Sequence, residues 1–165
     1  MKQAVIIGAS GGLGGALARL LLNQEGWRVL GTHHQSEPLW QHPLMSWRTL
    51  DVRSEKEIAA LMTLLPKIDL LINTTGILTT PHQGPEKSIW QFNAEHMMMS
   101  FETNTAPILN LAKHAQAALK ASHRPIIVAL SARVGSISDN DLGGWYSYRC
   151  AKAALNMAVK TLAIE

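Results

Sequence analysis

The stretch AVIIGASGGLGGALARLLL, residues 4–22, decides how the fold of this chain is interpreted. Residues 4–7 form a short apolar run in which three of the four residues are β-branched, which is typical of a buried strand. After the glycines, apolar residues recur at helical spacing, which predicts a helix with an apolar stripe at Leu13, Leu17, Leu20 and Leu21. A strand, a glycine-rich turn and a helix in this order predict a nucleotide site, because the first N–H groups of a helix are unpaired and attract phosphate.

The glycines of this turn are Gly8, Gly12 and Gly14, spaced G-x-x-x-G-x-G. Glycine lets the backbone turn tightly and lets a pyrophosphate approach it closely. A tight turn with no ligand is the alternative interpretation. The position of the turn, after a strand and before a helix, favours nucleotide binding.

The rest of the chain alternates strand and helix patterns, which predicts a doubly wound parallel sheet of the α/β class with helices on both faces. A single domain over residues 1–165 accommodates the whole pattern. Pro107 predicts a kink or break near residue 106. The further strands are expected at 27–32, 47–50, 68–72 and 125–130, the helices at 54–65, 94–121 and 146–164, and long loops at 33–46 and 77–88.

Composition excludes several classes of function. Hydrophobic residues make up 47% and charged residues 16% of the chain, a globular balance, and the net charge is only +3. Basic residues are scattered, so we expect neither nucleic acid nor membrane as a partner. Cys150 is the single cysteine and the histidines show no ligand spacing, so no disulfide and no metal site are expected. A cytoplasmic protein is the simplest interpretation.

Tyr148 stands four residues before Lys152 near the end of the chain. Residues at this spacing share one face of a helix, so both side chains are expected to point into one site. A free tyrosine has a pKa of roughly 10, too high for ready proton exchange at neutral pH. We expect the nearby ammonium to lower that pKa and to make Tyr148 a general acid for reduction and a base for oxidation.

Five motifs in order resemble the short-chain dehydrogenase/reductase family. They are the glycine turn, Asp51–Val52, Asn73–Thr74–Thr75–Gly76, Asn104, and a serine followed by Tyr148 and Lys152. The run LSARVGSISDN…GGWYSYR is similar to the C-factor and sniffer-type carbonyl reductases of that family. The resemblance implies a Rossmann-like fold and hydride transfer between a nicotinamide cofactor and a small carbonyl or alcohol substrate.

The resemblance also implies roles for single residues. Lys152 would bond the nicotinamide ribose as well as Tyr148, Asn104 would hold a water that links Lys152 to solvent, and a serine would bind the substrate oxygen. The implied catalytic residues are Asn104, Ser131, Tyr148 and Lys152. The implied cofactor-binding residues are Gly8, Ser10, Gly12, Leu13, Gly14, Thr32, His33, Asp51, Val52, Asn73, Thr74, Thr75, Gly76, Tyr148 and Lys152.

Two positions depart from the family pattern. Thr74 and Thr75 replace an amide and a methyl, and we expect the turn to survive with added hydroxyl hydrogen bonds. Counting forward from Ile126 places the catalytic serine at Ser131, whereas counting back from Gly135 reaches Ala132. The loop therefore looks one residue longer than usual. We favour Ser131, with Ser136 as the alternative.

Cofactor choice follows from the end of the second expected strand, which reads GTHHQ. An NAD enzyme usually carries an acid there to bond the ribose hydroxyls. None is present, so NADP(H) is expected in preference to NAD(H), with Thr32 and His33 near the 2′-phosphate. Gly11 gives no support, because many NADP enzymes of the family place a basic residue there.

The family usually has about seven strands, whereas five are visible here, so we expect the chain to be incomplete at its C-terminus. A polypeptide ending at Glu165 would keep an exposed sheet edge beside the fifth strand and bind dinucleotide weakly, with little reductase activity. A homodimer or homotetramer is expected through the helices around Asn104 and Tyr148. The alternatives to an active enzyme are a dinucleotide-binding sensor or scaffold without catalysis, and an inactive fragment.

Overall fold

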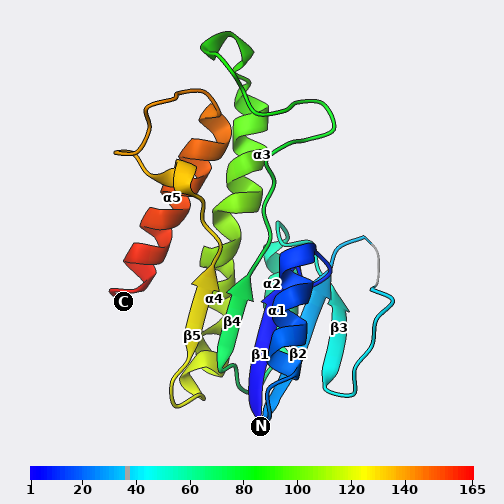
Figure 1. Cartoon of the computed structure of the whole chain (residues 1–165). Coiled ribbons are helices and arrows are strands. Elements are labelled where there is room, and N and C mark those ends of the chain that lie inside the picture. Colours follow the sequence, from blue (N-terminus) through cyan, green and yellow to red (C-terminus); the bar gives the residue numbers. More distant parts are fainter. Residues whose placement is uncertain (36–37) are drawn as a thin grey trace. The chain divides into compact units, whose positions relative to one another are not determined.

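The structure is a computed structural model that describes residues 1–35 and 38–165 (Figure 1). The loop expected at 33–46 includes residues 36–37, which lie outside the described residues. No helix in the described part of the chain is long and apolar enough to cross a membrane. The elements are β1 (Lys2–Ile7), α1 (Gly12–Leu22), β2 (Trp27–His33), β3 (Met45–Thr49), α2 (Glu55–Thr63), β4 (Leu70–Asn73), η1 (Ile89–Gln91), α3 (Ala94–Asn104), α4 (Ala106–Lys120), β5 (Ile126–Ala129), η2 (Arg133–Gly135) and α5 (Tyr146–Leu162).

The strands form one parallel sheet in the order β3-β2-β1-β4-β5. Helix α1 lies on one face of this sheet, and α2 and α4 lie on the other (Figure 1). The predicted doubly wound, Rossmann-like fold is therefore confirmed. The strand order reverses between β1 and β4, and ligands of such sheets bind at the carboxyl ends of the strands beside this reversal.

Each face of the sheet has its own apolar core, because side chains alternate between the two faces along a strand. Ala4, Ile6, Val29 and Ile72 pack on the α1 side. Val5, Ile7, Leu30 and Leu71 pack on the side of α2 and α4, together with Leu111, Ala115, Ala118 and Leu119 of α4. Ile108 and Ala112 of the same helix are also buried.

The expected apolar stripe of α1 is confirmed for Leu17 and Leu21, which pack against the core on this face of the sheet, and is wrong for Leu13 and Leu20. Leu13 and Leu20 are 55% and 56% exposed, and the helix instead buries Gly14, Gly15, Ala18 and Leu22. The backbone explains this choice: a Cβ on Gly14 would lie 2.4 Å from the Gly8 carbonyl oxygen. The first turn of α1 approaches the preceding turn so closely that only glycine fits on its buried side at residues 14 and 15 without a shift of neighbouring atoms, whatever the hydrophobicity of the other residues.

The break predicted near residue 106 is confirmed. Helix α3 ends at Asn104 and α4 begins at Ala106, with Thr105 as the residue between them. Pro107 therefore falls in the first turn of α4, where its missing N–H removes no helical hydrogen bond. The one helix expected at 94–121 is therefore two helices.

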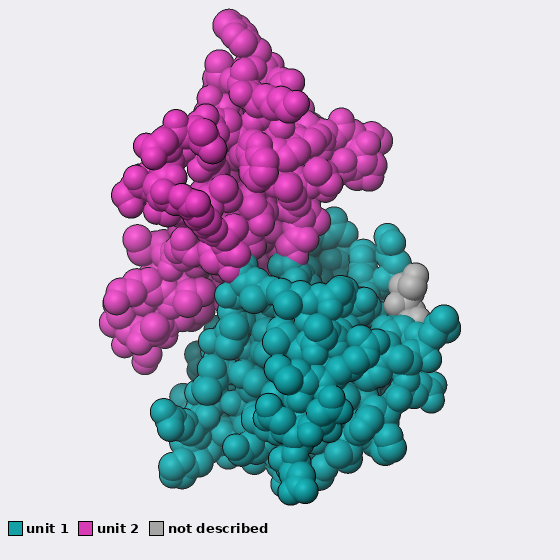
Figure 2. Space-filling view, in the orientation of Figure 1, with its two compact units in different colours: residues 1–75, 110–130 teal, residues 76–109, 131–165 magenta. Residues whose placement is uncertain are grey.

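The chain divides into two compact units, coloured separately in Figure 2. Unit 1 comprises Met1–Thr75 and Asn110–Leu130, and contains the whole sheet. Unit 2 comprises Gly76–Leu109 and Ser131–Glu165, and contains α3 and α5. The residues expected to bind the dinucleotide phosphates lie in unit 1, and the four expected catalytic residues lie in unit 2.

Candidate active site

The glycine turn of unit 1 needs glycine at two of its three motif positions. Gly8 has a φ of +84°, a conformation that side chains other than glycine rarely adopt. Gly14 packs against the Gly8 carbonyl oxygen, as described above. A Cβ on Gly12 would meet no other atom within 4 Å. Gly8 and Gly14 therefore shape the turn, whereas Gly12 leaves open space at the start of α1, where a helix binds phosphate best.

Thr32 at the end of β2 fixes this turn from the neighbouring strand. Its hydroxyl accepts a hydrogen bond from the Gly8 N–H at 3.0 Å, and its carbonyl accepts one from the Ser10 N–H at 3.3 Å. The side chain is 2% exposed. Thr32 was expected beside a ribose phosphate, and the structure gives its buried hydroxyl a second task, which is to hold the shape of the turn.

The turn after β4 is held by the two threonines that depart from the family pattern. The Thr74 hydroxyl donates to the carbonyl of Ile7 at 2.8 Å, and the Thr75 hydroxyl donates to Asn73 Oδ1 at 2.7 Å. The Thr75 N–H also donates to Asn73 Oδ1 at 3.1 Å. The expectation that the turn survives and gains hydroxyl hydrogen bonds is confirmed.

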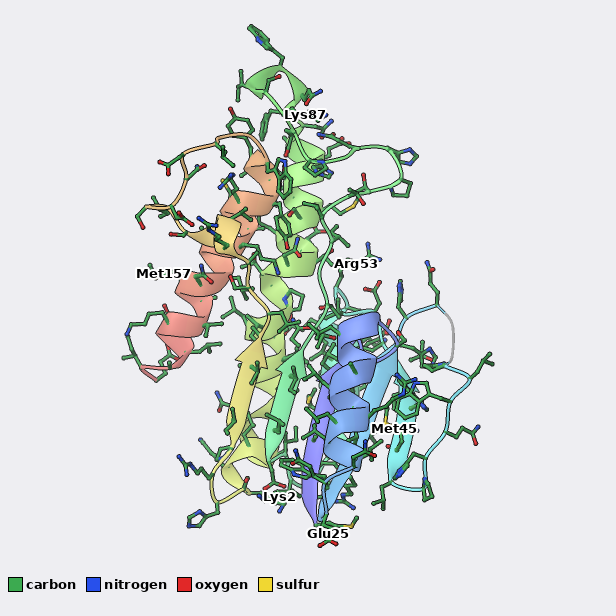
Figure 3. The ribbon with its side chains drawn as sticks, in the orientation of Figure 1. Lys2, Glu25, Met45, Arg53, Lys87 and Met157 are labelled. Carbon is green, nitrogen blue, oxygen red and sulfur yellow. The ribbon has the colours of Figure 1, made fainter. Side chains whose placement is uncertain are left out.

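Charged and polar side chains gather where β2 and β3 end. Arg53, labelled in Figure 3, donates two side-chain hydrogen bonds to the Asp51 carboxylate, at 2.8 and 3.1 Å. The Arg53 side chain is the main reason that the pKa of Asp51 falls to about 2. His34 Nε2 lies 3.8 Å from the same carboxylate. Val52, expected near the adenine, is buried.

His33, the other residue expected near the 2′-phosphate, ends β2. Its Nδ1 is buried and has no hydrogen-bond partner among the described residues. A buried polar atom without a partner is uncommon in proteins and calls for an explanation.

In unit 2, Tyr148 and Lys152 lie one turn apart on α5, as predicted. Lys152 Nζ is 5.5 Å from the centre of the Tyr148 ring, and Lys152 is 3% exposed. The Trp145 ring packs edge-on against the Tyr148 ring, with 6.5 Å between their centres. The two side chains expected to act together are therefore neighbours, with Lys152 buried and Tyr148 half-buried.

The expected lowering of the Tyr148 pKa is contradicted. Burial raises the pKa of Tyr148 and lowers the pKa of Lys152, because both charged forms lose hydration. The Lys152 ammonium lies over the face of the Tyr148 ring, and from there its attraction does not offset the free-energy cost of burying a phenolate.

Asn104, the last residue of α3, lies near Lys152 and binds the backbone that follows Gly76. Its Oδ1 accepts the Ile77 N–H at 3.0 Å, and its Nδ2 donates to the Ile77 carbonyl at 2.9 Å and to Ser100 Oγ at 3.0 Å. A Cβ on Gly76 would lie 2.7 Å from Asn104 Oδ1 and 3.5 Å from Lys152 Nζ. Glycine at residue 76 therefore lets Asn104 and Lys152 approach the same stretch of backbone.

The two candidate serines have different surroundings. Ser131 Oγ donates to Asn156 Oδ1 at 2.6 Å, and Asn156 Nδ2 donates to the Gly135 carbonyl at 3.3 Å. Ser136 Oγ lies 3.3 Å from Ser138 Oγ and accepts the Asp139 N–H at 3.3 Å. Ser131 is thus tied to the helix that carries Tyr148, whereas Ser136 stabilises a local turn.

Sequence reasoning missed three residues that hold this helix. Asn156 orients Ser131, and the hydroxyls of Ser100 and Thr105 donate to the α5 carbonyls of Ser147 at 3.3 Å and Ala151 at 2.8 Å. Each of these carbonyls belongs to the residue just before Tyr148 or Lys152. The signal was the presence of small polar residues on helix faces that are otherwise buried.

Comparisons with known proteins agree with this geometry. The family model described as short chain dehydrogenase matches residues 2–165. C-signal of Myxococcus xanthus is 29% identical over 98 residues, which are 59% of this chain and 56% of that protein. The chain therefore spans little more than half the length of C-signal.

Two solved structures are similar over 99% of this chain. The carbonyl reductase Sniffer of Drosophila melanogaster is 26% identical, with a TM-score of 0.87 and 75% of that chain covered. A short-chain dehydrogenase/reductase from Burkholderia multivorans with bound NADP is 28% identical, with a TM-score of 0.85 and 72% of that chain covered. The chain belongs to the short-chain dehydrogenase family of oxidoreductases.

Proposed function

We propose that this chain binds NADP(H) and reduces a small carbonyl compound, or oxidises the corresponding alcohol, with Tyr148 as the general acid and base. The observation that carries the proposal is the cluster of Tyr148, Lys152 and Asn104 in unit 2, in which Asn104 is hydrogen-bonded to Ile77, and Ser100 and Thr105 are hydrogen-bonded to carbonyls of α5. Family membership and the NADP-bound relative support the cofactor class.

The residues of unit 1 fit a dinucleotide. Gly12 leaves space at the start of α1, and Gly8 and Gly14 shape the turn around it, so the backbone at Gly12 and Leu13 would hold the pyrophosphate. The buried, unpartnered Nδ1 of His33 suits a ligand oxygen, and we assign it to the 2′-phosphate end of the cofactor. When bound, NADPH supplies the hydride.

The residues of unit 2 divide the proton chemistry. Tyr148 Oη would donate its proton to the substrate oxygen during reduction and take it back during oxidation. Ser131 Oγ, which here donates to Asn156 Oδ1, would turn its hydrogen to that oxygen as negative charge develops on it. Lys152 would favour the Tyr148 phenolate once a bound ligand changes the surroundings of the ammonium. Asn104 would fix the backbone at Ile77 through its two hydrogen bonds there.

Replacement of the acid tests the proposal directly. Tyr148→Phe removes only the hydroxyl, so carbonyl reduction is expected to be abolished while NADPH affinity stays within about twofold. Ser131→Ala is expected to cost much more activity than Ser136→Ala. Steady-state kinetics and fluorescence titration with NADPH measure both effects. Full activity of Tyr148→Phe would disprove the role of Tyr148, and the reverse order of the serine variants would move that role to Ser136.

Cofactor preference has its own test. Titration with both reduced cofactors is expected to show tighter binding of NADPH than of NADH. An acid at the end of β2 would bind the ribose hydroxyls of NADH and repel the 2′-phosphate of NADPH, and β2 ends without one. His33→Ala is expected to weaken NADPH binding more than NADH binding, and Leu39→Ala, at a fully exposed position, is the control. Tighter binding of NADH by the unmodified chain would contradict the proposal.

A dinucleotide-binding protein without catalysis is the second candidate. The observation that favours it is the raised pKa of Tyr148 together with the lowered pKa of Lys152, which is the opposite of an activated tyrosine. Binding of NADPH without turnover of any carbonyl substrate would establish this alternative.

We further propose a cytoplasmic homo-oligomer formed through α3 and α5. Both helices carry exposed apolar side chains, including Met98 on α3 and Met157 on α5, which is labelled in Figure 3. Exposed apolar side chains on neighbouring helices support an interface there when they form a contiguous patch.

A further inference from the structure

Glu86 is a buried carboxylate that the proposed chemistry does not use. It lies in the long loop that joins Gly76 to η1, next to Lys87, which is labelled in Figure 3. Only 1% of its surface is exposed. A buried acidic side chain is costly unless hydrogen-bond donors surround it, so its contacts indicate why it is there.

All of the donors recorded for this carboxylate belong to Ser147, the residue just before Tyr148. The Ser147 N–H lies 3.3 Å from Glu86 Oε1 and 3.4 Å from Oε2, and the Ser147 hydroxyl also donates to Oε1. The backbone carbonyl of Glu86 accepts the N–H of Trp145 at 2.5 Å. Glu86 therefore binds the chain on both sides of residue 146, where α5 begins.

This start of α5 needs support from outside the helix. Gly143, Gly144 and Trp145 all have positive φ, at +66°, +63° and 53°, and the Trp145 side chain makes no capping hydrogen bond. A regular N-cap would satisfy the first N–H groups with its own side chain. Here the Glu86 carboxylate, 61 residues away along the chain, accepts the Ser147 N–H instead. It lies at the N-terminal end of the helix, where negative charge is favourable.

The same loop is also held at its other end. Asn104 binds both backbone groups of Ile77, and Asn104 Nδ2 reaches Ser100 Oγ, which donates to the Ser147 carbonyl at 3.3 Å. Ser147 thus donates hydrogen bonds from its N–H and hydroxyl to Glu86, and its carbonyl accepts one from Ser100. Every polar group of the residue before Tyr148 contacts a residue outside α5.

We propose that Glu86 is a positioning residue for Tyr148: by accepting the N–H and hydroxyl of Ser147, it fixes the first turn of α5 and with it the place of the Tyr148 hydroxyl. This inference rests on the proposed role of Tyr148 as the acid. A small displacement of a catalytic group lowers the rate strongly without a matching loss of binding.

Three variants test the proposal. Glu86→Ala removes both acceptors, so kcat for carbonyl reduction is expected to fall about tenfold or more, while NADPH affinity changes by less than about twofold. Glu86→Gln keeps the shape and one acceptor oxygen, so it is expected to restore kcat to within about threefold. Glu102→Ala, at an exposed position on α3, is the matched control and should leave kcat unchanged. Unchanged kcat in Glu86→Ala, or an equal loss in Glu86→Gln, would overturn the proposal.

A double-mutant cycle tests whether Glu86 acts through Ser147, and Ser147→Ala by itself covers the case in which Glu86→Ala folds poorly, because its kcat is expected to fall as well. Ser147→Ala removes one hydroxyl and is the milder change. If Glu86 acts through Ser147, the loss of kcat in the double variant is expected to be clearly smaller than the product of the two single losses. Fully multiplicative losses would show that Glu86 acts elsewhere.

Amide hydrogen exchange separates this inference from the proposed function, because it needs no activity. Exchange at the Ser147 N–H is expected to be at least about tenfold faster in Glu86→Ala than in the unmodified chain or in Glu102→Ala. That result in a protein without reductase activity would refute the proposed chemistry and leave the anchoring role in place. Unchanged exchange would overturn the anchoring role itself.

Discussion

At the scale of single residues, the glycine turn separates two roles that look alike in the sequence. Gly14→Ala would place a methyl group 2.4 Å from the Gly8 carbonyl oxygen, a distance that side-chain carbons do not tolerate. We expect this variant to lose roughly 1–3 kcal/mol of unfolding free energy, because α1 must move away from the turn. Thermal or denaturant unfolding followed by circular dichroism measures the loss.

Gly12→Ala is the matched control for folding and the test for binding. Its new methyl group meets no atom within 4 Å, so we expect unchanged or slightly higher stability. The same methyl group would occupy the space left for a pyrophosphate, so NADPH affinity is expected to fall at least about tenfold. Equal stability of both variants would contradict the assigned packing, and unchanged NADPH affinity of Gly12→Ala would move the phosphate site elsewhere.

The residues that sequence could identify are those whose chemistry is local. Tyr148 and Lys152 share a helix face because of their spacing alone, and the Thr74 and Thr75 hydroxyls reach their own turn and the adjacent end of β1. The raised pKa of Tyr148 was not predictable, because it depends on how deeply the ring is buried. Glu86 was missed for a similar reason: its partner Ser147 is brought near it by the tertiary fold.

At the scale of elements, Asp69 joins three parts of unit 1 at the end of the sheet opposite the glycine turn. Its carboxylate accepts the Gln3 N–H of β1 at 2.7 Å and the Ser122 hydroxyl at 2.6 Å, and it lies 3.2 Å from Lys67 Nζ. Burial raises the pKa of Asp69, but these donors together outweigh burial, so the net change lowers it. Ser122 follows α4, so one carboxylate links β1, β4 and the end of α4.

This lowered pKa predicts how stability depends on pH. The Asp69 contribution is complete above the unfolded pKa of about 3.9 and is lost as pH falls through the lower folded value. We expect Asp69→Asn to reduce the unfolding free energy at pH 7 and to flatten its decline below pH 4. Urea unfolding across this range measures both effects, with Asp141→Asn, at an exposed position, as the control. The same acid dependence in Asp69→Asn and in the unmodified chain would exclude this role.

Element boundaries were predictable where turn chemistry is strong. Ser54 caps α2 by accepting the Glu57 N–H, as the pattern SEKE indicates. The inward face of α1 was predicted correctly at Leu17 and Leu21 but not at Leu13 and Leu20, because the first turn is set by how closely the backbone approaches Gly8, and hydrophobic periodicity carries no information about that distance. Sequence patterns report which residues are apolar, and packing decides which of them are covered.

At the scale of the whole molecule, the parallel sheet followed from the alternation of strand and helix patterns. The division into two compact units did not follow, because it cuts through α4 and separates Thr75 from Gly76 inside one motif. Both units are assembled from segments distant in sequence. The residues expected to bind the dinucleotide phosphates and the expected catalytic residues fall into different units for this reason, although their motifs alternate along the chain.

Strand β5 forms one edge of the sheet. Strand β5 pairs with β4 on one side only, and Ile126 and Ile127 are 52% and 37% exposed. The exposed edge expected beside the fifth strand is therefore present in the described chain. Unpaired backbone groups next to exposed isoleucines favour pairing with another chain, and a lysine on such a strand opposes it.

We expect the 165-residue protein to associate as its concentration rises, and Ile126→Lys to shift this association to several-fold higher concentration. Leu39→Lys is the control, because it places the same charge at a fully exposed leucine away from β5. Sedimentation velocity over a concentration series distinguishes the variants. Equal suppression by both lysines would attribute the effect to net charge. Association that Ile126→Lys leaves unchanged would move the contact from β5 to another surface, of which the α3 and α5 helices are the first to test.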